Sequence, residues 1–383
     1  MSWQDSTLGA LTKLDGGLIQ TGPFGSQLHQ AEYEAEGIPV VMPKDITDGG
    51  ISSETVARVS EQTATRLERH KLKPRSIVLP RRGEITKRAF IRDEQDGWLC
   101  GTGCLKIELN GDHLVPEYLY YFMEQEHVTK WLLQHAVGST MLNLSAGIVA
   151  AMPVRYPEIN VQKAIAETLS TYDDLIDNNR RRMALLEDSA RQLYREWFVR
   201  LRFPGHEHTS IVDGVPQGWE RKTLGESITL NYGKALKAEL RVEGDYPVYG
   251  SSGIVGTHEK PLVQGPAIVL GRKGNVGSVY WSSKSFFPID TVYFVSAESS
   301  SLYLYYVLKH MHFISTDVAV PGLNRDFAYS RTMLHPPETL LRSFHETVES
   351  IHAQLDKLDE TNQKLRQARD LLLPRLMNGE LAV

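Results

Sequence analysis

Two long stretches of the chain carry mostly apolar side chains at alternating intervals of four and three residues. The first stretch begins at Ile165 and the second at Phe344. This spacing places a narrow apolar seam along an α-helix, and such a seam is best buried against a second one. We therefore predict two long helices that pair as a coiled coil; packing of each helix on its own globular domain is the alternative. The seam positions are Ile165, Leu169, Tyr172, Ile176, Asn179, Met183, Leu186, Ala190, Leu193 and Trp197, and then Phe344, Val348, Ile351, Leu355, Leu358, Asn362, Leu365, Arg369, Leu372 and Leu376.

Shorter apolar runs elsewhere in the chain predict strands. The runs are "GIPVVM" from Gly37, "SIVLP" from Ser76 and "CLKIEL" from Cys104, then "YPVYG" from Tyr246, "AIVLG" from Ala267 and "TVYFVS" from Thr291. Each half of the chain also has a helical pattern, "VPEYLYYFMEQEHV" from Val115 and "SLYLYYVLKHMHF" from Ser301. Strands and helices do not alternate regularly, so the predicted fold class is α+β.

The two halves of the sequence repeat each other in one order, which indicates two copies of one unit. "WQDSTLG" from Trp3 returns as "WERKTLG" from Trp219, and "SIVLPRRGEITK" from Ser76 aligns without gaps on "AIVLGRKGNVGS" from Ala267. The other matches are "EYLYYFMEQ" from Glu117 with "LYLYYVLKH" from Leu302, Leu142-Asn143 with Leu323-Asn324, and "MPVRYP" from Met152 with "MLHPP" from Met333. A pseudo-two-fold relation between the copies makes the two long helices antiparallel.

The repeat and the heptads divide the chain into six predicted segments. Pairing Ile165 with Leu376 across the seam puts Asn179 opposite Asn362, where a buried polar pair would fix the register. Proline and glycine in Pro204-Gly205 and Asp213-Gly214 predict a linker loop between the first helix and the second copy. The segments are two globular domains at 1–158 and 218–338, two long helices at 159–200 and 339–377, the linker at 201–217 and a C-terminal tail at 378–383.

The whole-chain composition is that of an ordinary globular protein and narrows the function little. The 383 residues carry a formal net charge of −5, which on its own does not suggest a nucleic-acid partner. Only two cysteines occur, Cys100 and Cys104, without a second pair of metal ligands at zinc-finger spacing, which favours reduced thiols over a metal site. No apolar run is long enough to cross a bilayer and no signal peptide is evident, so we expect a cytoplasmic protein without membrane contact.

Catalytic motifs are hard to find in this sequence. There is no GxxxxGK[ST], HExxH or GxSxG, and "HPPE" at His335 lacks the flanking residues of the amino-methyltransferase tetrapeptide. The "GRKGNVG" run from Gly271 does not match a dinucleotide-binding fingerprint. We therefore predict a non-catalytic chain with no cofactor or metal of its own.

Positive charge is concentrated locally. The segment from Arg66 to Arg92 holds ten Arg or Lys residues and only two Glu, which is the kind of footprint that nucleic acid requires. Within it, Arg81-Arg82-Gly83 aligns with Arg272-Lys273-Gly274 of the second copy. A turn with two cations and a glycine can approach and grip a phosphate backbone. A solvated surface is the alternative interpretation.

Loops in which the copies differ are the predicted readers of DNA sequence. They are Thr21–Gln30 against Tyr232–Arg241, and the loop Tyr249–Gly253. Polar side chains there can offer donors and acceptors to base edges. The full set of predicted DNA-binding residues is Lys44, Arg81, Arg82, Lys87, Arg88, Lys234, Lys237, Ser251, Ser252, Arg272 and Lys273.

The chain resembles the specificity subunit of type I restriction-modification enzymes over nearly its full length. The segments that carry this resemblance are "GPFGSQLHQAEYEAEGIPVVMPKDI" from Gly22, "VQKAIAETLSTYDDLIDNNRRRMALLEDSARQLYREWF" from Val161, "VPQGWERKTLGE" from Val215, "YPVYGSSGIVG" from Tyr246 and "LRQARDLLLPRLMNGEL" from Leu365. The resemblance implies two target recognition domains separated by an antiparallel coiled coil of two long helices. It implies a DNA-binding subunit of a phage-defence restriction system, which recognises an asymmetric bipartite target in double-stranded DNA.

The resemblance also implies partners. Two adenine-N6 methyltransferase subunits and two ATP-dependent translocase and nuclease subunits would bind this chain, and S-adenosylmethionine, ATP and Mg would act in those subunits. Three alternatives stay open: a specificity module of a related phage-defence methylation system, a self-contained DNA-modifying enzyme, and a coiled-coil adaptor without DNA contact.

Overall fold

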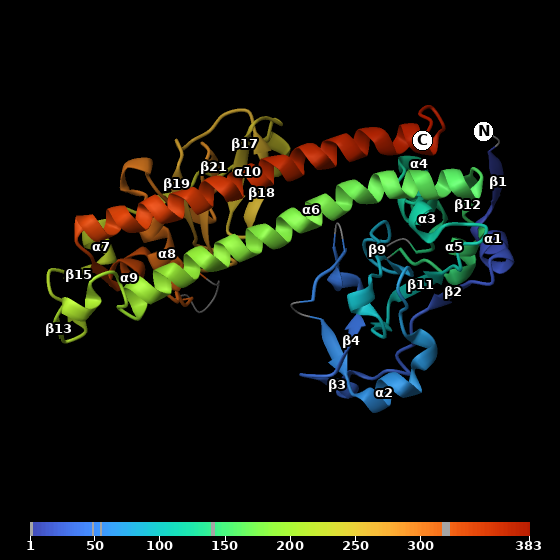
Figure 1. Ribbon diagram of the computed structural model, residues 1–383, viewed down its shortest axis with the longest axis horizontal. Coiled ribbons are helices and arrows are strands. Elements are labelled where there is room, and N and C mark those ends of the chain that lie inside the picture. Colours follow the sequence, from blue (N-terminus) through green and yellow to red (C-terminus); the bar gives the residue numbers. More distant parts are fainter. Residues whose placement is uncertain (1–2, 48–49, 54–55, 139–141, 316–321) are drawn as a thin grey trace. The chain divides into compact units, whose positions relative to one another are not determined.

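The chain folds into two compact units, each with a mixed α+β globular part. The structure, a computed structural model, describes residues 3–47, 50–53, 56–138, 142–315 and 322–383. One unit is Met1–Asn178 with Asn362–Val383, and the other is Asn179–Thr361. The two predicted long helices are present as α6 (Ile159–Tyr194) and α10 (Glu338–Met377), and each contributes to both units (Figure 1). Because the division passes through both helices, the domain boundaries predicted at their ends stay predictions.

Among its described residues, the first unit contains two four-stranded sheets and two two-stranded ribbons, the second of which is formed by β5 and β6. One sheet has the order β2-β11-β8-β9 and the other β10-β4-β7-β3, while β1 pairs with β12. The strands are β1 (Gln4–Thr7), β2 (Leu18–Thr21), β3 (Tyr33–Glu34), β4 (Ile38–Val41), β5 (Ile46–Thr47), β6 (Gly50–Ile51), β7 (Ala57–Val59), β8 (Ile77–Pro80), β9 (Ala89–Phe90), β10 (Leu99–Cys100), β11 (Cys104–Glu108) and β12 (Pro153–Tyr156). The short helices are α1 (Leu8–Leu14), α2 (Glu61–Arg66), α3 (Pro116–Phe122), α4 (Glu126–His135) and α5 (Ala146–Ala151).

The second unit repeats this plan with fewer strands. Its sheets have the orders β16-β22-β19-β20 and β18-β17-β21, and β15 pairs with β23. The strands are β13 (Ile211–Val212), β14 (Val215–Pro216), β15 (Glu220–Thr223), β16 (Asn231–Tyr232), β17 (Tyr246–Gly250), β18 (Gly253–His258), β19 (Ala267–Gly271), β20 (Val279–Ser282), β21 (Phe287–Pro288), β22 (Val292–Val295) and β23 (Thr332–His335). The helices besides α6 and α10 are α7 (Leu224–Ser227), α8 (Leu302–His310) and α9 (Arg325–Tyr329).

The predicted α+β class and the internal repeat are confirmed. Strands β4, β8 and β11 and their counterparts β17, β19 and β22 lie where the apolar runs predicted them. The predicted helix from Val115 is two helices, α3 and α4, because the chain leaves helical geometry at Gln125, which caps α4. The predicted linker at 201–217 is not all loop, since it contains the β13–β14 hairpin with Asp213 and Gly214 in the left-handed region that its tight turn requires.

Hydrogen bonds correct the alignment of the two copies near the long helices. The amide of Leu144 donates to Arg81 O, and the amide of Leu323 donates to Arg272 O, so Leu144 and not Leu142 is the counterpart of Leu323. Strand pairing likewise makes Val154 the counterpart of Met333. Val154 of β12 pairs with Ser6 of β1, and Met333 of β23 pairs with Lys222 at the equivalent position of β15. Both matches in the sequence were therefore displaced by two residues.

The long helices pack antiparallel within each unit. In the first unit, Ile165 and Leu169 near the start of α6 share a core with Leu373 and Leu376 near the end of α10. In the second unit, the ring of Trp197, just after α6, lies 6.0 Å from that of Phe344 near the start of α10. The seam residues are buried or half-buried: Ile176, Ala190, Val348 and Leu355 are buried, whereas Met183, Leu186, Leu358 and Leu365 are half-buried. Asn179 and Asn362 are both buried, and their pairing stays a prediction.

Candidate nucleic-acid interface

The turn Arg81-Arg82-Gly83 leads from β8 toward β9 in the first unit. Its backbone is fixed at both sides, because the Arg81 amide donates to Gly103 O at 2.7 Å and Arg81 O accepts from the Leu144 amide at 2.9 Å. Gly83 has φ 77°, a conformation that L side chains rarely adopt. Arg82 and Gly83 are exposed, so the turn presents a cation and bare backbone to solvent.

The turn Arg272-Lys273-Gly274 has the same geometry in the second unit. The Arg272 amide donates to Thr291 O at 2.9 Å, and Arg272 O accepts from the Leu323 amide at 2.8 Å. Gly274 also has φ 77°. Lys273 and Gly274 are exposed, like Arg82 and Gly83. The structure thus places the two predicted turns at equivalent positions, each on a rigid sheet.

An aromatic ring supports the first arginine of each turn. The Arg81 guanidinium lies 5.9 Å from the ring centroid of Phe24, and the Arg272 guanidinium lies 4.9 Å from that of Tyr232 and 5.6 Å from that of Tyr293. A ring face attracts a guanidinium and orients its plane. The rings of Phe24 and Tyr232 come from the two loops, Thr21–Gln30 and Tyr232–Arg241, that the sequence singled out as candidate readers.

Two further predicted sites, Lys44 and Ser251, lie near the two turns. Lys44 follows Pro43, and Pro43 packs close to Gly103, since a Cβ added at Gly103 would lie 3.2 Å from the proline ring. Gly103 is the residue whose carbonyl accepts the hydrogen bond from the Arg81 amide. In the second unit the Ser251 amide donates to the Thr291 hydroxyl at 3.3 Å, and Thr291 holds Arg272. The Ser251 carbonyl accepts from the hydroxyl of Ser278 at 2.6 Å. Each turn therefore has a neighbouring loop beside it, containing Lys44 in one unit and Ser251-Ser252 in the other.

Lys234 and Lys237 lie on the loop that follows β16. Both side chains are exposed, and the Lys234 amide donates to Pro288 O at 3.0 Å. This bond ties the start of the loop to β21. The loop begins directly after Tyr232, whose ring contacts the Arg272 guanidinium, so the start of the loop lies near the second turn.

Lys87 and Arg88 have partners inside the first unit. Lys87 pairs with Glu84 at 2.6 Å. The Arg88 side chain is only 10% exposed, donates from Nε to Tyr120 O at 2.9 Å and pairs with Glu124 at 3.2 Å. Within residues 66–92, all of which the structure describes, acidic partners also bind Arg66, Lys73, Arg75 and Arg92. The free positive charge of this segment is therefore smaller than its sequence suggests.

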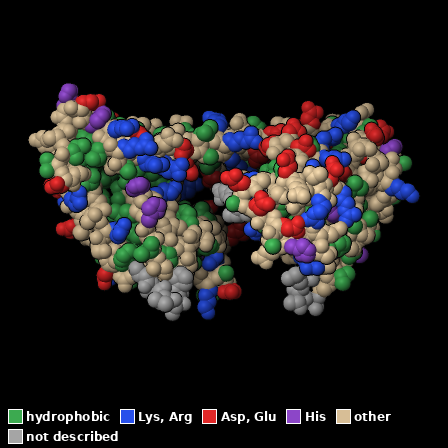
Figure 2. Space-filling model, turned by 90° about the horizontal axis from the view of Figure 1, so that it is seen from below, with side chains coloured by type: hydrophobic (Ala, Val, Ile, Leu, Met, Phe, Trp, Pro, Cys, Tyr) green, Lys and Arg blue, Asp and Glu red, His purple; other side chains and the backbone are tan. Residues whose placement is uncertain are grey.

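Acidic and basic side chains are interspersed on the visible surface (Figure 2). This mixture agrees with the net charge of −5. Among the predicted DNA-binding cations, Arg82 and Lys273 of the two turns are exposed, and so are Lys44, Lys234 and Lys237.

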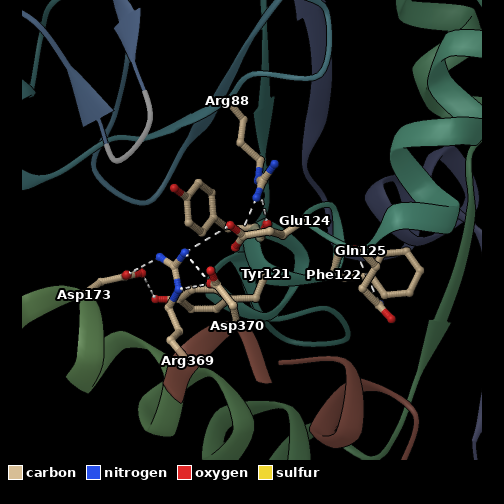
Figure 3. Close-up of polar contacts among 9 residues, drawn as sticks. Arg88, Tyr121, Phe122, Glu124, Gln125, Asp173, Arg369 and Asp370 are labelled. Carbon is tan, nitrogen blue, oxygen red and sulfur yellow. Dashed lines mark hydrogen bonds and ion pairs between the residues drawn. The ribbon is translucent and has the colours of Figure 1, made fainter. Parts of the chain in front are cut away.

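Glu124 also joins Arg88 to the long helices (Figure 3). Arg369 of α10 lies between Asp173 of α6, at 2.5 Å, and Glu124, at 3.4 Å. The Tyr121 hydroxyl donates to Asp173 at 2.7 Å. Burial and the adjacent carboxylate of Asp173 raise the pKa of Tyr121. This network connects Arg88, the residue before β9, with both long helices, α6 and α10.

Chemistry beyond ion pairing has little support among the described residues. Burial raises the pKa of the Cys100 thiol to about 12 and that of Cys104 above its ordinary value, so neither is a thiolate at neutral pH. The described residues contain no group of three or more His, Cys, Asp or Glu side chains placed to hold a metal ion. In the same part of the chain, no helix is long and apolar enough to cross a membrane.

Sequence reasoning missed one residue beside the second turn. Arg325, the first residue of α9, has its guanidinium 5.2 Å from the Tyr232 ring centroid. The only sequence signal near it is Asn324, a typical helix N-cap whose side chain accepts from the amides of Asp326 and Phe327. A helix start does not by itself indicate that the next side chain reaches a loop formed by distant strands.

Comparisons with known proteins agree with the repeated architecture. A sequence model described as "Type I restriction modification DNA specificity domain" matches residues 2–188 and 216–326, more than half of the chain. The type I restriction enzyme MjaIX specificity subunit of Methanocaldococcus jannaschii is 23% identical over 386 residues, covering 92% of this chain and 88% of the relative. The HindI specificity subunit of Haemophilus influenzae is 21% identical, covering 76% and 83%.

A solved structure supports the fold. The crystal structure of the type I restriction-modification system S subunit from M. genitalium matches with a TM-score of 0.58 at 20% sequence identity, covering 98% of this chain and 96% of that one. The match of the family model over most of both copies is what decides membership. The chain therefore belongs to the family of type I restriction-modification specificity subunits.

Proposed function

We propose that this chain binds double-stranded DNA through both units and recognises an asymmetric bipartite target. The observation that carries the proposal is the equivalence of the turns Arg81–Gly83 and Arg272–Gly274. Each has two cations followed by a glycine at φ 77°, and each follows the equivalent strand of its unit's sheet, β8 in the first unit and β19 in the second. Arg and Lys neutralise phosphates, and a bare glycine backbone lets the phosphate approach closely.

The surroundings of the two turns differ, which supports two different half-sites. Lys44 is exposed beside the first turn, whereas beside the second turn Ser251 is buried and Ser252 is exposed. Phe24 supports Arg81, whereas Tyr232 supports Arg272. Shared cations suit the phosphate backbone, which every sequence has, and unshared side chains suit the base edges, which differ.

The chain itself is non-catalytic in this proposal and directs reactions of its partners. Two methyltransferase subunits would transfer a methyl group to adenine N6 using S-adenosylmethionine, and two translocase and nuclease subunits would use ATP and Mg for cleavage. The names of the relatives, specificity subunits of type I restriction enzymes, support this division of labour.

The experiment that tests DNA binding removes the cations of one turn at a time. Arg81→Ala with Arg82→Ala, and separately Arg272→Ala with Lys273→Ala, should weaken binding of target duplex. The slope of log affinity against log salt should become shallower by about 0.9 for each phosphate that the variant no longer neutralises. Lys130→Ala is the matched control, because Lys130 is an exposed cation of α4 paired with Glu126 at 2.6 Å.

Two results would decide against the proposal. One is unchanged affinity and salt slope in both double variants. The other is an equal loss of affinity in the Lys130→Ala control, which would mean that net charge alone governs binding.

A further inference from the structure

Arg325 is fixed beside the second turn by backbone contacts. It opens α9, and the nearby Leu323 amide donates to Arg272 O at 2.8 Å. At the other end of α9, the Tyr329 hydroxyl accepts from the Leu230 amide at 2.9 Å. The helix is thus bonded both to the turn and to the segment that leads into β16. Arg325 is held where the candidate DNA surface of the second unit begins.

The guanidinium of Arg325 lies beside two aromatic rings. It lies 5.2 Å from the Tyr232 centroid and 5.9 Å from the Tyr329 centroid. Tyr232 is 49% exposed, and its ring centroid also lies 4.9 Å from the Arg272 guanidinium. Stacking fixes the plane of a guanidinium while its donors stay available for a bidentate acceptor.

The charge of Arg325 is not neutralised within the described part of the chain. Its Nε is buried and has no hydrogen-bond partner there. Asp326, the next residue, is exposed and uses its amide to bind the Asn324 cap. A donor that is buried and unsatisfied is uncommon in proteins and requires an explanation. The buried Nε faces the protein, whereas no acceptor among the described residues engages the two terminal Nη groups, so these are the donors that an acceptor on a ligand would meet.

The first unit has no counterpart of this arginine. Ser145 caps α5 as Asn324 caps α9, so Ala146 occupies the position of Arg325. The cations of the two turns are shared between the units, but Arg325 is not. A phosphate contact is useful in both half-sites, whereas a contact with a base is useful in one. This asymmetry favours a base as the acceptor.

We propose that Arg325 is a specificity-determining residue of the second unit, which reads a guanine through bidentate hydrogen bonds to its O6 and N7 in the major groove. The inference rests on the proposed DNA-binding function. Guanine is the base whose two adjacent acceptors match the guanidinium fork, and lysine cannot reproduce that planar geometry.

The test uses the full-length chain assembled with its methyltransferase subunits. Methylome sequencing with the wild-type complex first defines both half-sites. Duplexes are then made in which each guanine of the second half-site is replaced singly by 7-deazaguanine, which lacks the N7 acceptor. Wild-type affinity should fall roughly 5- to 100-fold at one guanine. Arg325→Ala should bind the normal duplex more weakly and show no further loss at that position, and Arg325→Lys should show a smaller loss there than the wild type.

Arg331→Ala is the matched control. Arg331 follows α9 and lies 5.9 Å from the Phe327 ring centroid, and its side chain is exposed. Arg331 therefore contacts the ring of Phe327, whereas Arg325 contacts the ring of Tyr232. This variant should keep the full 7-deazaguanine effect. A thermal unfolding curve of Arg325→Lys shows whether the fold persists when the charge is kept.

Three results would overturn the assignment. The first is a second half-site without any guanine on either strand. The second is an undiminished 7-deazaguanine effect in both Arg325 variants. The third is a wild-type motif in Arg325→Lys together with a shallower salt slope in Arg325→Ala, which identifies a phosphate contact. Failure of the proposed function is distinct from these, because the wild-type complex would then show no motif-dependent methylation.

Discussion

The phenol oxygen of Tyr306 lies 3.0 Å from Nε2 of His352 in the second unit. Its counterpart in the first unit is the hydrogen bond from Tyr121 to Asp173, at 2.7 Å. The same tyrosine of the repeat therefore contacts an acid on α6 in one unit and a histidine on α10 in the other. The acid takes part in a charged network, whereas the histidine is held among aromatic rings, those of Trp281 and Tyr305.

His352 should make the stability of the second unit depend on pH. Burial, with a smaller contribution from Lys309, lowers the pKa of His352 from 6.5 to about 4. The unfolded chain therefore binds the proton more tightly than the folded chain. The stabilisation is complete above about pH 6.5 and is lost as the pH falls toward 4, by about 1 kcal/mol between pH 7 and 5 after allowance for partial exposure.

Urea unfolding at several pH values checks this. His352→Gln should unfold with a smaller loss of stability between pH 7 and 5 than the wild type. His208→Gln, at an exposed histidine, should follow the wild type. An unchanged pH dependence in His352→Gln would remove His352 as its source.

Arg369 should stabilise the first unit through the network of Figure 3. Its side chain is 17% exposed and contacts Asp173, Glu124 and Asp370. Arg369→Leu leaves these carboxylates without their cation, at a cost of about 1–3 kcal/mol, because removing one partner of a buried group of charges leaves the others uncompensated. The midpoint of thermal unfolding should fall by roughly 2–10 °C.

Arg375→Leu is the control on the same helix. Arg375 is exposed and its contact with Glu380 is 4.0 Å long, so its loss should change stability by less than about 0.5 kcal/mol. Equal effects of the two substitutions would show that the network of Arg369 contributes nothing specific.

The glycines of the two turns should matter for DNA binding more than for folding. Gly83 has φ 77° and an added Cβ would meet nothing within 4 Å, so Gly83→Ala introduces backbone strain of about 1–2 kcal/mol without a clash. If the turn relaxes to relieve this strain, Arg81 and Arg82 move. We expect DNA affinity to fall several-fold while the fold is retained.

Filter-binding or anisotropy titrations with target duplex measure this effect. Gly147→Ala, at a glycine inside α5, is the control that should leave affinity unchanged. Wild-type affinity in both Gly83→Ala and Gly274→Ala would show that the conformation of the turns is not needed for binding.

The overall architecture could be predicted from sequence because it depends on local patterns. Heptads predict α6 and α10, apolar runs predict β4, β8 and β11, and the repeat predicts the second unit from the first. The sequence alignment placed Leu142, and not Leu144, opposite Leu323 because residue identities alone do not show which backbone groups form hydrogen bonds. Only the bonds from Leu144 and Leu323 to the two turns fix the alignment.

The candidate site was predictable only in part, because a sequence does not show which charges have partners. Arg81 and Arg272 were found through their repeated setting, and both are placed as the repeat implies. In the sequence, Arg88 was as good a candidate for phosphate contact as the neighbouring cations. In the structure it forms an ion pair with Glu124, which lies between α3 and α4. Arg325 was missed for the converse reason, since strands far away in sequence bring Tyr232 beneath it.

Methylome sequencing of cells that express this chain with its methyltransferase subunits tests the central claim most directly. The account predicts methylated adenines in a motif of two different specific blocks separated by unspecified bases. It also predicts lower methylation, in the same motif, for the double alanine variants at Arg81-Arg82 and at Arg272-Lys273. A continuous motif, two identical half-sites, or full methylation in both double variants would contradict the account.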